Sequence, residues 1–271
     1  PALESVMQAE LESHPAFTDP RYRARREHIA ALSARPSICD VEYTADEHAV
    51  WRSVRARLDP LHETHACRAV REAQRALPLA PDRIPQLAEV SRRLERLSRF
   101  RLCAVAGLVA PRPFFAALAD GVFLATQYVR HCSAPFYTPE PDVIHELVGH
   151  VAMLADERIA ALARAFGRLA RAADESTLAR VQRVFWFGLE FGMCREDGGT
   201  RALGAGLLSS AGELEHAMDG AHRRAWRPWD LDAMATTDYG TTDYQHALFV
   251  APGFATLVDD LAAWVRDEGG C

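Results

Sequence analysis

Apolar and charged residues alternate at helical spacing over most of the chain, as expected for helices that bury one face. The pair Asp19-Pro20 is a typical helix start, with an acidic cap before a proline at the first helical position. The helical pattern at residues 46–76 is long enough for two helices. Together these patterns predict helices at residues 21–35, 46–76, 85–97, 158–172 and 176–191.

Two short apolar runs interrupt the helical pattern and predict strands at residues 99–108 and 122–129. One helical turn or more is expected between them, at residues 114–118. The proline-rich segment 135–141, PFYTPEP, predicts an irregular connection. The predicted fold class is therefore mostly α with a few short strands.

Length, charge and hydropathy narrow the class of protein. The 271 residues fit one large domain or two small ones, and 49% hydrophobic residues are enough for a substantial core. A net charge of −6 without a basic tract argues against a nucleic acid partner. The N-terminus lacks the pattern of a signal peptide, and no run approaches the roughly 18 apolar residues of a membrane span. We therefore expect a cytoplasmic protein that does not enter the membrane.

The six cysteines are widely spaced and form no CxxC pair, which in a chain of this length predicts reduced thiols. His62, His65 and Cys67 lie close together in the sequence. Because no nearby residue completes a tetrahedral ligand set, this cluster is not expected to bind zinc.

Two histidines and a glutamate form the most informative pattern in the chain. His145 and His150 bound the segment HELVGH, and Glu190 lies within the apolar run VFWFGLEF. Two imidazoles and one carboxylate are the ligands of the facial-triad Fe(II) oxygenases, which keep open positions for O2 and substrate. A carboxylate among aromatic side chains is expected to be buried, and therefore to bind a metal or to pair with an arginine.

A zinc peptidase is the alternative interpretation of the histidine pair. Its motif places two histidines four residues apart, so that both reach one metal, with a glutamate as general base. Here the spacing is 150 − 145 = 5, which rotates the second histidine by about 140° on a regular α-helix. Gly149 precedes His150, and a local irregularity there would help the rings to converge. The spacing thus disfavours a zinc-dependent hydrolase that uses Glu146 as its base.

A longer stretch of sequence points to a family. Residues 126–142, TQYVRHCSAPFYTPEPD, together with HELVGH closely resemble the catalytic domain of the pterin-dependent aromatic amino acid hydroxylases. Other similar segments occur before and after this stretch in consistent order, so the resemblance covers residues 14–255. These segments are DPRYRARR at 19–26, THAC at 64–67, DRIPQL at 82–87, VAGL at 105–108, residues 186–194 and GAGLLSS at 204–210.

The resemblance implies a single aromatic amino acid hydroxylase-like catalytic domain over residues 1–271, with residues 1–18 as an N-terminal extension. It implies no regulatory domain and no C-terminal tetramerisation helix, and hence a monomer. The implied cofactors are Fe(II) and tetrahydrobiopterin or a related tetrahydropterin, with O2 as co-substrate. His145, His150 and Glu190 would bind the iron, and Asp142 would orient and tune His145. Without the family, Asp142 is as good a helix N-cap.

The resemblance also implies which residues form the pterin side of the active site. Phe114 would stack on the pterin ring, and Glu146 would face the ring without binding iron. Leu124 and Phe185 depart from the pattern, since animal enzymes have a histidine at the first position and the family usually has a tyrosine at the second. The implied pterin residues are Val109, Ala110, Phe114, Glu146 and Phe185.

On the substrate side, the resemblance implies that Arg130 binds the α-carboxylate of the substrate, because a guanidinium forms two parallel charge-assisted bonds. Local sequence alone favours an internal salt bridge for this arginine. Thr138 and Ser209 would complete the pocket. Trp186 leaves less room for an indole substrate and so favours phenylalanine. Arg26 and Glu140 match positions that pair in the family.

The implied activity is hydroxylation of the ring of a free aromatic amino acid, with L-phenylalanine converted to tyrosine as the first choice. The same chemistry on L-tryptophan and meta-hydroxylation of phenylalanine are the alternatives within this class. A zinc hydrolase and a non-catalytic metal-stabilised protein are the alternatives outside it. No partner other than a small aromatic amino acid is expected.

Overall fold

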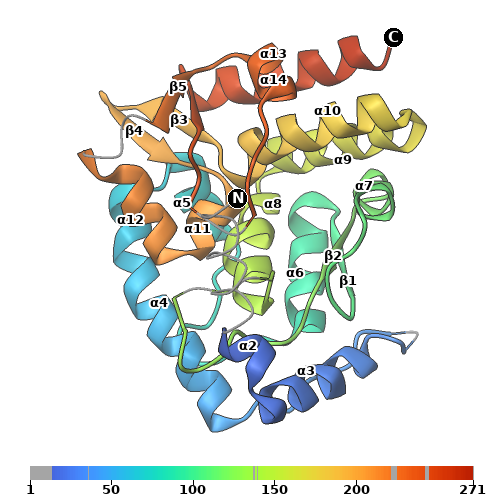
Figure 1. Ribbon diagram of the computed structural model, residues 1–271, viewed down its shortest axis with the longest axis vertical. Coiled ribbons are helices and arrows are strands. Elements are labelled where there is room, and N and C mark those ends of the chain that lie inside the picture. The colour runs from blue at the N-terminus through green and yellow to red at the C-terminus, as the bar shows by residue number, and fades with distance from the viewer. Residues whose placement is uncertain are drawn as a thin grey trace.

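The computed structural model describes residues 14–35, 37–136, 138, 140–220, 225–241 and 244–270. Most described residues are helical, as predicted, and Figure 1 shows the helices wrapping around a central segment that contains α8. The main apolar cluster of the described residues runs from Val50 to Val265, and two smaller clusters accompany it. Among the described residues, no helix combines the length and the apolar character needed to cross a membrane.

The helices expected from the hydrophobic pattern are present, with boundaries that the local caps explain. Asp19 caps α3 by accepting hydrogen bonds from the backbone N–H groups of Arg21 and Tyr22, as its start signal predicted. The long pattern at 46–76 is two helices, α4 and α5, separated at Ala66-Cys67. Thr44 and Glu47 form a capping box at the start of α4. The helices of the N-terminal half are α2 (Pro15–Thr18), α3 (Pro20–Leu32), α4 (Ala45–His65), α5 (Arg68–Ala76), α6 (Leu87–Ser98) and α7 (Pro111–Ala119).

The second half of the chain departs more from the predicted pattern. The helix expected at 158–172 is α9, but the one expected at 176–191 changes its winding near residue 186. No helix was predicted beyond residue 191. The elements of this half are the π-helices η1 (His145–Val151) and η2 (Trp186–Glu190) and the α-helices α8 (Ala152–Leu154), α9 (Glu157–Ala172), α10 (Glu175–Phe185), α11 (Ala205–Ser209), α12 (Ala211–Met218), α13 (Leu231–Thr236) and α14 (Phe254–Glu268).

Among the residues that the structure describes, six short strands form two small sheets. The two predicted strands are β1 (Arg101–Ala104) and β2 (Val122–Ala125), which pair in parallel with Leu102 opposite Phe123. The second sheet was not predicted, and its strand order is β4-β3-β6-β5. Its strands are β3 (Met193–Glu196), β4 (Gly199–Ala202), β5 (Trp226–Pro228) and β6 (Leu248–Ala251).

Close packing of α7 against α9 fixes one wall of a cavity that Phe114 and Phe115 line. Gly167 of α9 permits this approach, because a Cβ atom there would lie 2.3 Å from the Ala119 nitrogen and 2.6 Å from the Phe115 carbonyl oxygen. Figure 1 shows α14 running alongside α9 and α10. The position of Phe114 and Phe115 on α7 thus depends on a glycine in a neighbouring helix.

Candidate active site

The two histidines converge because the segment between them is a π-helix. In η1 the backbone is wound with hydrogen bonds between residues five apart, so that such residues share a face. His145 Nε2 and His150 Nε2 lie 3.0 Å apart. The expected irregularity is confirmed and extends over the whole segment. Gly149 serves packing as well, since a Cβ atom there would lie 2.7 Å from the carbonyl oxygen of Ala205 in α11.

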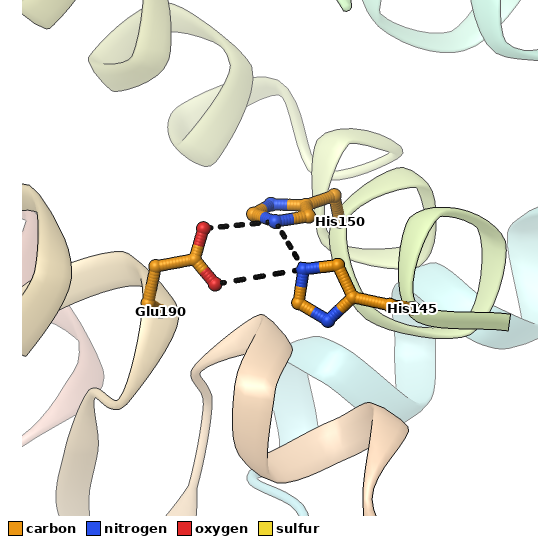
Figure 2. Close-up of side chains that lie close together, drawn as sticks. All are labelled: His145, His150 and Glu190. Carbon is orange, nitrogen blue, oxygen red and sulfur yellow. Dashed lines mark hydrogen bonds and ion pairs between the residues drawn. The ribbon is translucent and has the colours of Figure 1, made fainter. Parts of the chain in front are cut away.

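Glu190 ends a second π-helical turn. The N–H of Phe191 donates to the carbonyl oxygen of Trp186 at 2.8 Å, a bond that spans five residues. The helix predicted at 176–191 is therefore present, but its last turn is π-helical, and α-helical spacing carries no sign of this wider turn. The side chain of Glu190 is 13% exposed, and it faces the two histidines rather than an arginine (Figure 2).

The three side chains form a compact set of metal ligands. Glu190 Oε1 lies 2.9 Å from His150 Nε2, and Glu190 Oε2 lies 3.8 Å from His145 Nε2. Neighbouring ligands about 2.1 Å from one ion and at right angles to each other lie about 3 Å apart. Figure 2 shows both rings coming from one helix and the carboxylate from the opposite side. In the part of the chain that the structure describes, this is the one cluster of metal-ligating groups.

The protonation states also suit a metal. Burial and the neighbouring His150 lower the pKa of His145 to about 4, so this ring is neutral at neutral pH. Burial raises the pKa of Glu190, but His150 and His145 outweigh this effect and hold the pKa below its usual value. A neutral imidazole and an ionised carboxylate are the forms that bind metal ions.

Ser209 contacts the ring of His145, and Asp142 contacts its backbone. The Nδ1 atom of His145 lies 2.9 Å from Ser209 Oγ, which leaves Nε2 for the metal. Asp142 accepts a hydrogen bond from the backbone N–H of His145 at 3.0 Å. The described contact that orients the ring therefore comes from Ser209, whereas the charge of Asp142 acts on the ring by opposing the lowering of the His145 pKa. Asp142 also bonds to the backbone at the start of η1, near the place where its position after Pro141 predicted an N-cap.

Arg130 forms the internal salt bridge that local sequence favoured. It is 2% exposed, and its Nε and Nη2 atoms donate to the Asp142 carboxylate at 2.9 and 2.8 Å. Its third nitrogen, Nη1, makes only long contacts, at 3.4 Å to the Ser209 carbonyl and 3.5 Å to the Pro135 carbonyl. Because Arg130 lines the cavity in front of the ligand cluster, Nη1 is the atom placed to meet a ligand.

A cavity of about 380 Å³ lies over the ligand cluster. All but one of the residues expected from the resemblance line it. The exception is Ala110, which is exposed at the N-cap of α7 and does not line the cavity, so its role toward the pterin stays a prediction. The expected residues that line the cavity are Val109, Phe114, Arg130, Thr138, His145, Glu146, His150, Phe185, Trp186, Glu190 and Ser209.

One side of the cavity is an aromatic wall with a buried carboxyl group. The ring of Phe114 meets those of Phe123 and Phe185 edge-on, each at a centroid distance of 6.0 Å. Glu146 Oε1 accepts hydrogen bonds from the backbone N–H and the hydroxyl of Thr126, at 3.0 and 3.1 Å. Burial raises the pKa of Glu146 to about 7. This wall can take a flat, polar-edged ring.

Another part of the cavity wall is formed by Trp186, which Tyr239 and Gln245 hold in place. The indole stacks on Tyr239 at 4.3 Å with an interplanar angle of 15°, and its Nε1 donates to Gln245 Oε1 at 2.9 Å. Thr138 Oγ1 donates to the carbonyl oxygen of Glu140 at 2.7 Å. The carboxylate of Glu140 pairs with Arg26, as expected.

Several lining residues were not predicted from the sequence. Glu213 in α12 is the most informative of them, because it is a second buried carboxylate, but the nearby Glu215 and His216 leave no apolar run of the kind that identified Glu190. Tyr239, Tyr244 and Gln245 carry no such signal, and only the folding of the chain after residue 225 brings them to the cavity.

The fold and the site define a class of metal- and pterin-binding enzymes. A sequence model described as biopterin-dependent aromatic amino acid hydroxylase matches residues 3–267. The chain belongs to this family, as the resemblance implied. Membership in it removes the zinc hydrolase and the non-catalytic protein as alternatives.

The individual relatives include enzymes with different substrates. Tyrosine 3-monooxygenase of Bos taurus is 41% identical over 259 residues, covering 93% of this chain and 52% of its own length. Phenylalanine-4-hydroxylase of Rattus norvegicus is 39% identical over 259 residues, covering 91% of this chain and 56% of its own length. The chain thus spans about half the length of the curated relatives it matches.

A solved structure is similar over nearly its whole length. Phenylalanine hydroxylase from Chromobacterium violaceum, crystallised with iron(III) and 7,8-dihydrobiopterin, has a TM-score of 0.81 and 29% identity, with 93% of each chain covered. The neighbour therefore holds a metal and a pterin of the kinds that the described residues of this chain fit.

Proposed function

We propose that the protein hydroxylates the ring of free L-phenylalanine to give tyrosine, with Fe(II), a tetrahydropterin and O2. The observation that carries this proposal is the convergence of His145, His150 and Glu190 at the floor of a cavity that also contains Arg130 and Phe114. When bound, iron would activate O2 and the reduced pterin would supply two electrons, so that one oxygen atom of O2 reaches the ring and the other is taken up by the pterin.

The metal ligands come from two segments and leave room for other ligands. Two histidine nitrogens and one carboxylate oxygen occupy three positions of an ion, and the remaining positions would face the cavity. Ser209 holds the His145 ring in the orientation that presents Nε2. The protein thereby keeps the metal open on the side where the substrates bind.

Arg130 would bind the carboxylate of the amino acid. The pair with Asp142 fixes the plane of its guanidinium before any substrate arrives, because two of its nitrogens are already bonded. A preorganised donor loses little conformational entropy on binding. The substrate ring would then extend away from Nη1 and over the ligand cluster.

The pterin would lie against the aromatic wall. Phe114 offers the cavity a ring that its edge-on neighbours hold in place. Phe185 lines the same wall and contributes no hydroxyl, so that polar contacts to the pterin would come from Glu146 and backbone groups such as those of Val109.

Trp186 supports phenylalanine as the substrate. Its indole is fixed by the stack on Tyr239 and by the bond to Gln245, so it cannot swing aside easily to admit a second indole. L-tryptophan and meta-hydroxylation of phenylalanine remain the alternative outcomes. Sequence similarity alone does not choose, since the relatives act on tyrosine and phenylalanine at comparable identity.

The proposal is tested by incubating the iron-loaded protein with tetrahydrobiopterin and O2 and, separately, with phenylalanine, tyrosine and tryptophan. Products are compared with hydroxylated standards by chromatography and mass spectrometry. We expect tyrosine from phenylalanine, only when pterin is present. Tryptophan as the preferred substrate, or meta-tyrosine as the product, would replace the specific proposal. No product from any of the three, with iron confirmed bound, would overturn it.

A further inference from the structure

The cavity contains a carboxylate that neither the metal nor the pterin side uses. Glu213 lies in the first turn of α12, is 7% exposed and lines the cavity. Its Oε1 atom accepts a hydrogen bond from the backbone N–H of Gln245 at 2.9 Å. In the described part of the chain, no arginine or histidine forms an ion pair with it, and Oε2 accepts no hydrogen bond.

A buried carboxylate without a cation is costly, and such groups are usually paired. Every other carboxylate that lines this cavity has a strong partner. Glu190 meets the histidines, Glu146 accepts two bonds from Thr126, and Glu140 pairs with Arg26. Glu213 is the exception, which indicates that its partner arrives with the ligand.

Glu213 and the proposed carboxylate site share one cavity. Arg130 Nη1 contacts the carbonyl oxygen of Ser209, and the next residue, Ser210, caps α12 by accepting the N–H of Glu213 at 3.2 Å. The guanidinium of Arg130 and the carboxylate of Glu213 thus line one cavity, and the contacts of these two residues fall on two consecutive residues, Ser209 and Ser210. The carboxylate and the ammonium group of an α-amino acid are attached to a single carbon and require such a pair of partners.

We propose that Glu213 binds the α-ammonium group of the substrate, so that Arg130 and Glu213 together select a free, zwitterionic amino acid. This inference rests on the proposed function and adds a residue that determines which substrates are accepted. Glu213 acts in binding and takes no part in the transfer of oxygen.

Glu213 also has a structural contact that a test must separate from binding. Its carboxylate accepts the backbone N–H of Gln245, and the side chain of Gln245 in turn accepts the indole N–H of Trp186. Glu213→Gln retains an oxygen for this bond and a nearly identical shape, and removes only the charge. Glu215→Gln is the matched control, because Glu215 lies on the same helix, pairs with Arg57 at the surface and does not line the cavity.

The experiment compares L-phenylalanine with 3-phenylpropanoate, which has the same ring and carboxylate and no ammonium group. Dissociation constants are measured on the iron-loaded protein by calorimetry, and KM and kcat are measured for phenylalanine. For Glu213→Gln we expect affinity for phenylalanine to fall at least tenfold while that for 3-phenylpropanoate is unchanged. Glu215→Gln should alter neither. Equal losses for both ligands, or no loss for phenylalanine, would overturn the proposal.

A second variant guards against a folding defect. Should Glu213→Gln unfold, Glu213→Asp retains the charge at a shorter reach and should lose affinity for phenylalanine alone; loss for both ligands, or for neither, would again overturn the proposal. Failure of the proposed function looks different. A wild-type protein that makes no hydroxylated product while Glu213→Gln loses phenylalanine selectively would contradict the reaction and support the ammonium site.

Discussion

At the scale of single residues, the site is built from buried charges whose partners are close by. Asp142 is fully buried, yet Arg130 and two backbone N–H groups hold the pKa of its carboxyl below its usual value despite the opposing effect of burial. Removing one member of such a pair leaves the other uncompensated. Arg130 therefore contributes to stability through its salt bridge and, as proposed, to substrate binding. Local sequence presented these two roles only as alternatives.

Arg130→Ala should raise KM for phenylalanine and also destabilise the fold by about 3–5 kcal/mol, because Asp142 is left as an unpaired buried charge. The double variant Arg130→Ala/Asp142→Asn removes that charge and should regain part of the stability while KM stays high. Urea unfolding and steady-state kinetics measure the two effects. Recovery of KM in the double variant would contradict a direct contact between Arg130 and the substrate.

Glu213 gives substrate binding a pH dependence. Burial raises the pKa of Glu213 to about 7, against a smaller opposite effect of the Gln245 N–H. The carboxylate is charged above this pH and neutral below it, whereas the ammonium group of phenylalanine is charged throughout. Affinity for phenylalanine should therefore fall as the pH is lowered from about 8 to about 6.

Calorimetry across this range on the wild type and on Glu213→Gln measures the effect. The variant should lose this component of the pH dependence. Any component shared by both proteins belongs to other groups, and a difference of zero would contradict the assignment. The other titratable or charged groups that line the cavity are Arg130, Glu140, His145, Glu146, His150, Glu190, Tyr239 and Tyr244.

At the scale of elements, two π-helical turns account for what the regular helical pattern could not predict. The spacing of five between the histidines disfavoured a zinc peptidase and hinted at irregular winding, but periodicity could not place the wider turn at Trp186. Each π-helix carries part of the ligand set at its face or end. Both π-helices pack against α11, which supplies Ser209.

Gly149→Ala tests how closely α11 must approach η1. The added methyl group would lie 2.7 Å from the Ala205 carbonyl oxygen, so one element has to shift. We expect a loss of about 1–3 kcal/mol in the free energy of unfolding and weaker iron binding, because Ser209 moves with α11. Gly220→Ala is the control, since a Cβ atom at Gly220 meets nothing within 4 Å. Equal iron affinity in both variants would show that this packing does not position His145.

At the scale of the whole molecule, helices could be predicted because they depend on local patterns. The four-stranded sheet could not, because it depends on pairing between distant segments. Helices with one apolar face were placed correctly up to residue 172. The four-stranded sheet was missed because its strands are three or four residues long and two of them pair with partners far along the chain. The same reason hid Glu213 and Gln245, which reach the cavity from segments that follow the recognisable motifs.

Iron should stabilise the whole fold, because its proposed ligands join two segments that are far apart in the chain. A metal that binds only the folded state at a hundred times its Kd adds about 2.7 kcal/mol. For a domain of this size we expect Tm to fall by roughly 5–10 °C when iron is removed by a chelator. Scanning calorimetry with and without iron measures the shift, and Glu190→Ala should show little of it. A full shift in Glu190→Ala would mean that iron stabilises the protein through other residues, and the ligand set proposed here would be wrong.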